Sequence, residues 1–260
     1  MIQKEIQKET EKFTPSNLLE GMTSISAVLN SGSENDRRIE EILIDSAKRK
    51  SKHAEIGFLT AKSHELGFPI RFVDAAEIDA ITVGSTHGGI VARTTPRTLP
   101  PLTGESIRQG GFYVYAEGIE DPYNFGYTLR SLWAAGVDGV VLPERNWMSA
   151  AGVVARASAG ASERMPIYTA SAEDAVECFK QAGYTVLCAG IRDSVSLFEE
   201  SFSYPLLLVI GGEKRGISRA VLDRADKIVR IDYGREFRGS LSAASAATVM
   251  AFELFRQNQT

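Results

Sequence analysis

The chain has 260 residues, of which 43% are hydrophobic and 24% are charged. This balance is typical of a folded globular protein with one or two domains, and it is too apolar for a disordered chain. The longest apolar run, residues 205–212, is far shorter than the roughly 20 residues that span a bilayer. The charged N-terminus has no apolar signal core, and Cys178 and Cys188 are the only cysteines, so we expect a cytoplasmic protein with reduced thiols.

The charge balance argues against non-specific binding to bulk nucleic acid, because 33 acidic residues outnumber 29 basic ones and the net charge is −4. A local basic patch is still compatible with this net negative charge. Residues 208–238 carry eight basic and five acidic side chains, and arginine outnumbers lysine thirteen to three in residues 105–260. The fork of an arginine suits contacts to phosphate, although solvated surface charge explains the same composition.

The N-terminal part predicts a small αβα domain over residues 17–95, preceded by an arm at 1–16 whose helical period is weak. The predicted elements are strands at 39–44, 70–73 and 89–92 and a helix at 51–66 that ends at Gly67. A proline-rich segment at 96–104 then disfavours helix and is typical of a stiff linker.

The C-terminal part, residues 105–260, alternates more regularly between strand and helix. The predicted strands are 112–116, 137–142, 167–169, 185–189, 206–210 and 227–231. The predicted helices are 123–135, 148–159, 173–182, 218–224 and 241–257. Because the strands at 185–189 and 206–210 are nearly continuous apolar runs, they are expected to be buried on both faces. The pattern therefore predicts an α/β domain whose parallel sheet is covered by helices.

Several common catalytic motifs are absent from the sequence. No GxGxxG follows a predicted strand, no GxxxxGK[ST] loop occurs, and neither HExxH nor GxSxG is present. The three histidines are scattered and do not pair with a cysteine in sequence, so we expect no metal site. Hydride transfer, P-loop phosphoryl transfer, zinc-dependent hydrolysis and serine hydrolysis are therefore disfavoured.

Three segments at the carboxyl ends of predicted strands remain as candidates, since open α/β sheets bind ligands there. They are residues 124–130, 207–218 and 228–247. Paired glycines in the second segment permit close approach of a ligand to the backbone. In the third, a helix that begins with serine and is lined by small residues permits tight packing and offers amides to a carboxylate.

Each segment also has a purely structural explanation. Asn124 and Ser218 are residue types that cap helices, and Arg130 could equally form a surface ion pair. The small residues of the third segment fit a capped, closely packed C-terminal helix. Taken singly, none of the three segments distinguishes a site from a helix start.

Taken together, the three segments resemble motifs one to three of the SpoU-type (TrmH-like) RNA ribose 2′-O-methyltransferases of the SPOUT superfamily. The family patterns are roughly NxGxxxR, GxExxG[ILM]S and SLNVSVA. The chain carries them as Asn124-x-Gly126-x-x-x-Arg130, Gly211-x-Glu213-x-x-Gly216-Ile217-Ser218 and Ser240-Leu241-Ser242-Ala243-Ala244-Ser245-Ala246. Residues 20–21 and 85–90 resemble the small substrate-binding domain of many such enzymes, so the likeness extends from residue 17 onward.

The resemblance implies a C-terminal parallel sheet tied in a trefoil knot, which general rules of chain connection would not anticipate. It also implies a homodimer with the active site near its interface, RNA as the partner and S-adenosylmethionine as the cofactor. The residues implied to hold the cofactor are Gly211, Gly212, Gly216, Ile231, Leu241 and Ser242.

The implied reaction moves a methyl group from a sulfonium to a ribose 2′-hydroxyl, so the enzyme must align the donor and assist loss of a proton. The implied catalytic residues are Asn124, Arg130, Glu213 and Ser240. A guanidinium stays protonated at neutral pH, so we expect Arg130 to bind the adjacent phosphate and stabilise charge on the 2′-oxygen. Asn124 would orient Arg130 or the ribose. Glu213 would hold the motif-one groups, and Ser240 would contact the substrate or position the donor.

The chain departs from the family pattern at two positions. Ser242 stands where motif three has asparagine, and Gly212 stands where asparagine is common before the glutamate. Serine still donates and accepts a hydrogen bond but reaches less far, so a displaced contact or a weaker catalyst is expected. The loop at 232–239 is unusually charged and is expected to extend toward RNA.

The resemblance assigns selection of the RNA to the N-terminal domain. Two groups of basic residues are expected to contact RNA there, with solvated surface charge as the alternative. They are Lys48, Arg49, Lys50 and Lys52, and then Arg93 and Arg97. No aromatic residues are interleaved as stacking platforms.

The sequence therefore predicts an S-adenosylmethionine-dependent methyltransferase acting on a ribose 2′-hydroxyl of RNA, with ribosomal RNA favoured over transfer RNA. The alternative is a non-catalytic RNA-binding or assembly protein that retains the fold while the residues around Ser242 have changed. A small-molecule methyltransferase is disfavoured by the N-terminal domain.

Overall fold

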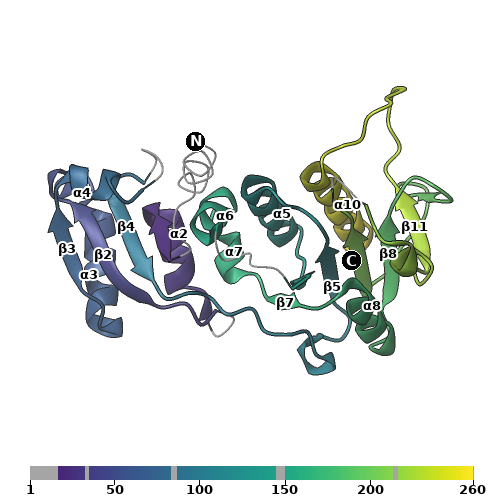
Figure 1. The fold of residues 1–260 in the computed structure, drawn as a ribbon, viewed down its shortest axis with the longest axis horizontal. Coiled ribbons are helices and arrows are strands. Elements are labelled where there is room, and N and C mark those ends of the chain that lie inside the picture. The colour runs from purple at the N-terminus through teal and green to yellow at the C-terminus, as the bar shows by residue number, and fades with distance from the viewer. Residues whose placement is uncertain (1–16, 33–34, 83–86, 145–149, 213–215, 260) are drawn as a thin grey trace, which may run out of the picture. The chain divides into compact units, whose positions relative to one another are not determined.

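The computed structural model describes residues 17–32, 35–82, 87–144, 150–212 and 216–259. The chain divides into two compact units (Figure 1). The first comprises Met1–Thr98 with Asn146–Arg164, and the second Leu99–Arg145 with Met165–Thr260. The predicted arm at 1–16 lies outside the described residues. No helix in the described ranges combines the length and apolarity that a membrane span requires.

The first unit is built on a four-stranded sheet in the order β1-β4-β2-β3. Its strands are β1 (Leu18–Glu20), β2 (Ile39–Asp45), β3 (Ile70–Val73) and β4 (Ile90–Thr94). Strands β2 and β3 are parallel, whereas β4 is antiparallel to both of its neighbours. Helices α2 (Gly21–Leu29), α3 (His53–Leu66) and α4 (Ala75–Asp79) and a 3₁₀ turn at Ser46–Lys48 complete it. Gly67 ends α3 with φ of 80°, as predicted.

Both faces of this sheet are buried, which confirms the predicted αβα arrangement. Leu19 and Ile42 lie in one apolar core with residues of α2 and α3, while Leu18 and Leu43 lie in another with Ile78 of α4. This alternation follows from the pleat, which sends successive side chains to opposite faces. The short strand β1 was not predicted.

Helices α6 (Ala151–Ala157) and α7 (Ala161–Arg164) also belong to the first unit. In sequence they lie between Gly139–Leu142 and Ile167–Thr169, which are strands of the second unit. Helix α6 contacts β1 and α2, and Ala155 lies in the core shared with Leu19. A Cβ added at Gly160 would lie 2.5 Å from that of Ala27, so α2 packs tightly against this turn. The compact unit thus includes residues outside the predicted 17–95 domain.

The second unit contains a seven-stranded sheet in the order β7-β6-β5-β10-β8-β11-β9. Every pair in it is parallel, as predicted. The strands are β5 (Phe112–Ala116), β6 (Gly139–Leu142), β7 (Ile167–Thr169), β8 (Thr185–Ala189), β9 (Val195–Ser196), β10 (Leu206–Ile210) and β11 (Lys227–Arg230). The helices are α5 (Pro122–Ala134), α8 (Ala172–Gln181), α9 (Arg219–Leu222) and α10 (Ala243–Gln257), with a 3₁₀ turn at Gly104–Ser106. The trefoil knot stays a prediction.

Two titratable groups near the middle of this sheet have shifted pKa values. Burial of Cys188 raises the pKa of its thiol to about 12. Burial opposes ionisation of Asp226, but hydrogen bonds from Lys180 (2.9 Å) and from the amide of Val186 (2.8 Å) outweigh it and lower the pKa of this carboxyl. Within the described ranges, no three His, Cys, Asp or Glu side chains gather as metal ligands.

Candidate active site

The loops that follow β5 and β10 touch each other backbone to backbone. The two strands are parallel neighbours, and beyond their ends the amide of Glu117 donates to the carbonyl of Ile210 (2.9 Å). A Cβ at Gly212 would lie 2.6 Å from the carbonyl oxygen of Gly118. Because the obstacle is backbone, only glycine at 212 permits this approach. Motif two is thereby held against the turn that leads into motif one.

The described ends of motif two lie close together. The amide of Gly216 donates to the carbonyl of Gly212 (3.0 Å), and Gly216 has φ of 63°. A Cβ at Gly211 would lie 2.6 Å from the carbonyl carbon of Gly216, whereas no atom of the described residues lies within 4 Å of one at Gly216. Gly211 is therefore required for close packing against Gly216, whereas the backbone at Gly216 itself is uncrowded by the described residues. Glu213 lies outside the described residues.

The helix that carries motif one, α5, is capped by Asp121 and not by Asn124. Asp121 is the N-cap of α5, and its carboxylate accepts from the amide of Asn124 (2.8 Å). The interpretation of Asn124 as the cap was therefore wrong, since Asp121 precedes it by one turn. Asn124 is half-buried in the first turn, and Arg130 is exposed. Within the part of the chain that the structure describes, Arg130 has no hydrogen-bond or ion-pair partner.

The third segment leaves the sheet as a long loop. Ile231 is half-buried, residues 232–240 are exposed, and the loop extends away from β11 before it returns to α10 (Figure 1). Ser240 is exposed, and the amide of Leu241 donates to the Tyr233 hydroxyl (3.2 Å), a contact that sequence reasoning missed. Its only sequence signal is an aromatic residue within a basic loop.

The hydroxyl of Ser242 is already engaged as the N-cap of α10. It accepts from the amide of Ser245 at 3.2 Å. Ser218 likewise caps α9, where it accepts from the amide of Val221 at 3.4 Å. The capping explanation for Ser218 is confirmed, whereas the third helix begins two residues later than predicted, with Ser242 as its cap. Any ligand contact of Ser242 must therefore share its hydroxyl with the helix start.

Helices α5 and α10 pack together in the second unit. Both follow strands of one parallel sheet, and a Cβ at Gly136, just after α5, would lie 3.9 Å from the Phe255 ring near the end of α10. The two helices therefore run in the same direction and begin at the same edge. The starts of motifs one and three therefore lie at the same edge as the described glycines of motif two.

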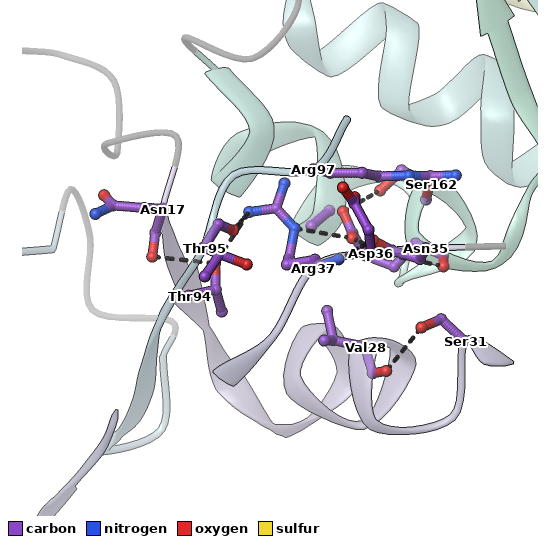
Figure 2. Close-up of polar contacts among 12 residues, drawn as sticks. Asn17, Val28, Ser31, Asn35, Asp36, Arg37, Thr94, Thr95, Arg97 and Ser162 are labelled. Atoms are coloured by element: carbon purple, nitrogen blue, oxygen red, sulfur yellow. Dashed lines mark hydrogen bonds and ion pairs between the residues drawn. The ribbon is translucent and has the colours of Figure 1, made fainter. Parts of the chain in front are cut away.

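The basic residues predicted to contact RNA differ in exposure. Lys48 and Lys50 are exposed, and so is Arg49, whose guanidinium lies 3.5 Å above the centre of the Phe72 ring. Arg93 is about half exposed and lies 3.8 Å from Glu41. Arg97 is only 5% exposed and donates to the carbonyl of Ser162 (Figure 2). Burial withholds that guanidinium from an RNA surface, so we no longer assign it there.

Two family models match the chain. The SpoU rRNA Methylase family matches residues 111–252, and the RNA 2′-O ribose methyltransferase substrate binding domain matches residues 18–100. A protein assigned to the TrmH family of tRNA/rRNA methyltransferases in Staphylococcus saprophyticus is 31% identical over 84% of this chain and 88% of its own length. The 23S rRNA (guanosine-2′-O-)-methyltransferase RlmB of Xylella fastidiosa is 29% identical over 91% of this chain and 96% of its own.

Solved structures share the fold. The AdoMet-bound rRNA methyltransferase of Sinorhizobium meliloti has a TM-score of 0.77 at 24% identity, covering 94% of this chain and 88% of its own. The SpoU methyltransferase AviRb of Streptomyces viridochromogenes, in complex with AdoMet, has a TM-score of 0.74 at 23% identity, covering 92% and 89%. These matches favour the predicted enzyme over the non-catalytic alternative. The chain belongs to the SpoU family of RNA 2′-O-ribose methyltransferases.

Proposed function

We propose that this chain transfers a methyl group from S-adenosylmethionine to a ribose 2′-hydroxyl of ribosomal RNA, as a homodimer in the cytoplasm. The observation that carries the proposal is that motif two contacts the turn before α5 and that α5 and α10, the helices of motifs one and three, pack together, with Arg130 exposed on α5. The names of the RlmB relative and of the two AdoMet complexes support the same substrate and cofactor.

The residues at this edge fit a nucleoside sulfonium. Among the described residues nothing crowds the Cα side of Gly216, and the main chain of Gly211 lies beside it. Ile231 is half-buried and Leu241 is 36% exposed, so apolar surface is available to an adenine ring. When bound, the sulfonium supplies a methyl group that is already activated by positive charge.

Arg130 binds the RNA phosphate next to the target ribose in this proposal. Its exposed fork can donate two parallel hydrogen bonds to phosphate oxygens, and it remains cationic at neutral pH. The same charge stabilises the 2′-oxygen as its proton leaves. Arg130 is therefore an electrostatic catalyst in our account, not a base.

The remaining motif residues orient these groups. Asn124, about 1.7 turns before Arg130 on α5, orients the guanidinium or the ribose. Ser240 is exposed at the end of the loop and is placed to contact the substrate. Because Ser242 caps α10, its main contribution is to fix the helix start whose first amides face the ligand. Glu213 completes the proposed set by holding the motif-one groups.

The test compares Arg130→Ala and Arg130→Lys with Arg256→Ala, an exposed arginine near the end of the neighbouring helix α10. Transfer of labelled methyl groups to unmodified ribosomal RNA is measured beside calorimetric binding of S-adenosylmethionine. We expect Arg130→Ala to lose about 10²–10³-fold in transfer, as when one transition-state donor is removed, with cofactor affinity near that of the wild type. Lysine should restore only part of the rate, because it lacks the fork.

The proposal fails if Arg130→Ala loses cofactor binding and transfer equally, or if transfer continues at the wild-type rate. Methylation of tRNA but not of ribosomal RNA would show that the proposed substrate is wrong. Sedimentation of the protein as a monomer at working concentration would refute the dimer.

A further inference from the structure

The long loop between β11 and α10, residues 231–242, exposes two aromatic rings to solvent (Figure 1). Tyr233 is 40% exposed and Phe237 is 59% exposed, and their ring centres lie 5.8 Å apart. Single exposed apolar side chains are common on protein surfaces, whereas exposed apolar groups that gather in one place mark a contact site. These two rings form an aromatic platform on the loop.

Two contacts hold the aromatic platform beside the start of motif three. The Tyr233 hydroxyl accepts from the amide of Leu241 at 3.2 Å, which joins the two sides of the loop near its base. The ring of Phe237 lies against Gly239, where an added Cβ would be 2.5 Å from Cζ of that ring. Because Gly239 directly precedes Ser240, a ligand on the platform lies next to the residue proposed to contact the substrate.

The charges around the aromatic platform favour a polyanion. Residues 227–238 carry four basic and two acidic side chains. Arg235 and Arg238 are exposed, and they precede and follow the second ring in sequence. One of the two carboxylates, that of Asp232, lies 2.7 Å from Nε of Arg230 and is neutralised by it. Rings that stack on bases, beside cations that contact phosphates, are the arrangement that binds single-stranded nucleic acid.

The ligand that suits the aromatic platform is a base of RNA and not the adenine of the cofactor. S-adenosylmethionine contains no phosphate, whereas every base of an RNA strand is joined to phosphodiesters that the two arginines can contact. Sites for small molecules also enclose most of the ligand, but these rings are open to solvent. Proteins that recognise RNA commonly stack unpaired bases on such aromatic side chains.

The geometry of the two rings assigns them different parts. Their planes are tilted by 59°, so one flat base can lie parallel to only one of them. Phe237 is the more exposed ring and offers the larger free face. Tyr233 is held at its hydroxyl and supports Phe237 through the tilted ring contact, a favoured geometry for aromatic pairs.

We propose that an unpaired base of the substrate RNA, close to the target nucleotide, stacks on Phe237 of the aromatic platform, while Arg235 and Arg238 contact the adjoining phosphates. The inference rests on the proposed function, since it places a nucleotide of that RNA beside motif three. The platform binds the RNA and takes no part in moving the methyl group.

The experiment compares Phe237→Leu with the matched control Phe198→Leu. Phe198 is 47% exposed in the same unit, but Glu199 and Glu200 follow it and repel phosphate. Fluorescence anisotropy measures binding of a labelled oligoadenylate and of an abasic oligonucleotide with the same number of phosphates. Phe237→Leu should weaken oligoadenylate binding about tenfold and leave binding of the abasic strand unchanged, because only stacking is lost. Phe198→Leu should change neither.

Two further sets of variants test the ring and the arginines separately. Phe237→Trp keeps a stacking face, so it should bind oligoadenylate as the wild type does. Its fluorescence, after subtraction of the wild-type signal, should be quenched by oligoadenylate and not by the abasic strand. Arg235→Gln and Arg238→Gln should each lower the slope of log affinity against log salt by about 0.7, the value for one phosphate contact to a single strand.

Wild-type affinity of Phe237→Leu for oligoadenylate would overturn the proposal, and so would an equal loss for the abasic strand. Loss of calorimetric S-adenosylmethionine binding in Phe237→Leu would also overturn it, because the ring would then contact the cofactor. In methyl transfer to ribosomal RNA, Phe237→Leu should raise KM for RNA more than it lowers kcat. If the platform binds as expected but the wild type transfers no methyl group, the proposed function fails and the platform stands.

Discussion

The ion pair between Arg37 and Glu163 provides the most quantitative test of how the first unit is held together. Nε of Arg37 lies 3.1 Å from Oε2 of Glu163, and their side chains are 0% and 3% exposed. The same Oε2 accepts from Asn35 Nδ2 at 2.6 Å, and Arg37 Nη1 donates to Thr94 Oγ1 at 3.0 Å (Figure 2). Glu163 is encoded between β6 and β7, so this pair anchors α7 to the first unit.

The perturbation is Glu163→Gln, which keeps the shape and an acceptor but removes the charge. Breaking a buried pair by removing one partner costs about 3–5 kcal/mol, because the other charge stays buried without compensation. Since glutamine can still accept one hydrogen bond, we expect the lower limit, about 3 kcal/mol. Natural domains are stable by about 5–15 kcal/mol, so the loss is a large fraction.

Hydrogen exchange of β2 measures this loss within one unit, which matters because a chain of two units need not unfold in one step. Exchange of peptides covering Ile39–Asp45 should be roughly 100-fold faster in Glu163→Gln, at about tenfold per 1.4 kcal/mol. Peptides covering β5 serve as the internal reference. Glu65→Gln breaks an exposed pair and should change the free energy of opening obtained from exchange by less than about 1 kcal/mol.

The reasoning is refuted if Glu163→Gln behaves like Glu65→Gln. A double variant, Arg37→Met with Glu163→Leu, tests the cause, because it removes both charges and fills the space. It should be more stable than Glu163→Gln, since no uncompensated charge remains. Equal destabilisation by the two would show that lost packing, not charge, is responsible.

Three further predictions follow from the second unit. Gly212→Ala should abolish methyl transfer and lower the melting temperature, whereas Gly57→Ala, with nothing within 4 Å of the new Cβ, should keep both. A thiol reagent at pH 8 should label half-buried Cys178 before Cys188, whose pKa of about 12 leaves little thiolate; equal rates would contradict this. The lowered pKa of Asp226 adds stability above its ordinary value near 3.8 that is lost as the pH falls below it. Asp226→Asn should therefore flatten acid unfolding curves there, and unchanged curves would contradict the assignment.

Local sequence determined the strands of the second unit well. The runs at 112–116, 167–169, 185–189 and 206–210 were predicted with the bounds that the structure shows. Buried parallel strands are continuous apolar runs, and glycines such as Gly136 and Gly183 end the preceding helices with positive φ. The three motif segments could also be placed after their strands, because motif order and strand ends are features of the chain itself.

Other features depend on contacts between residues far apart in sequence. The assignment of α6 and α7 to the first unit rests on the Arg37–Glu163 pair and on packing around Ala155. The burial of Arg97 depends on Ser162, 65 residues away. Local periodicity contains no information about such partners, because hydrophobic pattern and charge are the same for an exposed arginine and for one that meets a carbonyl inside the fold. The sequence by itself therefore determined the strand order along the chain and the motif positions, and only the tertiary structure decided which basic residues remain available to RNA.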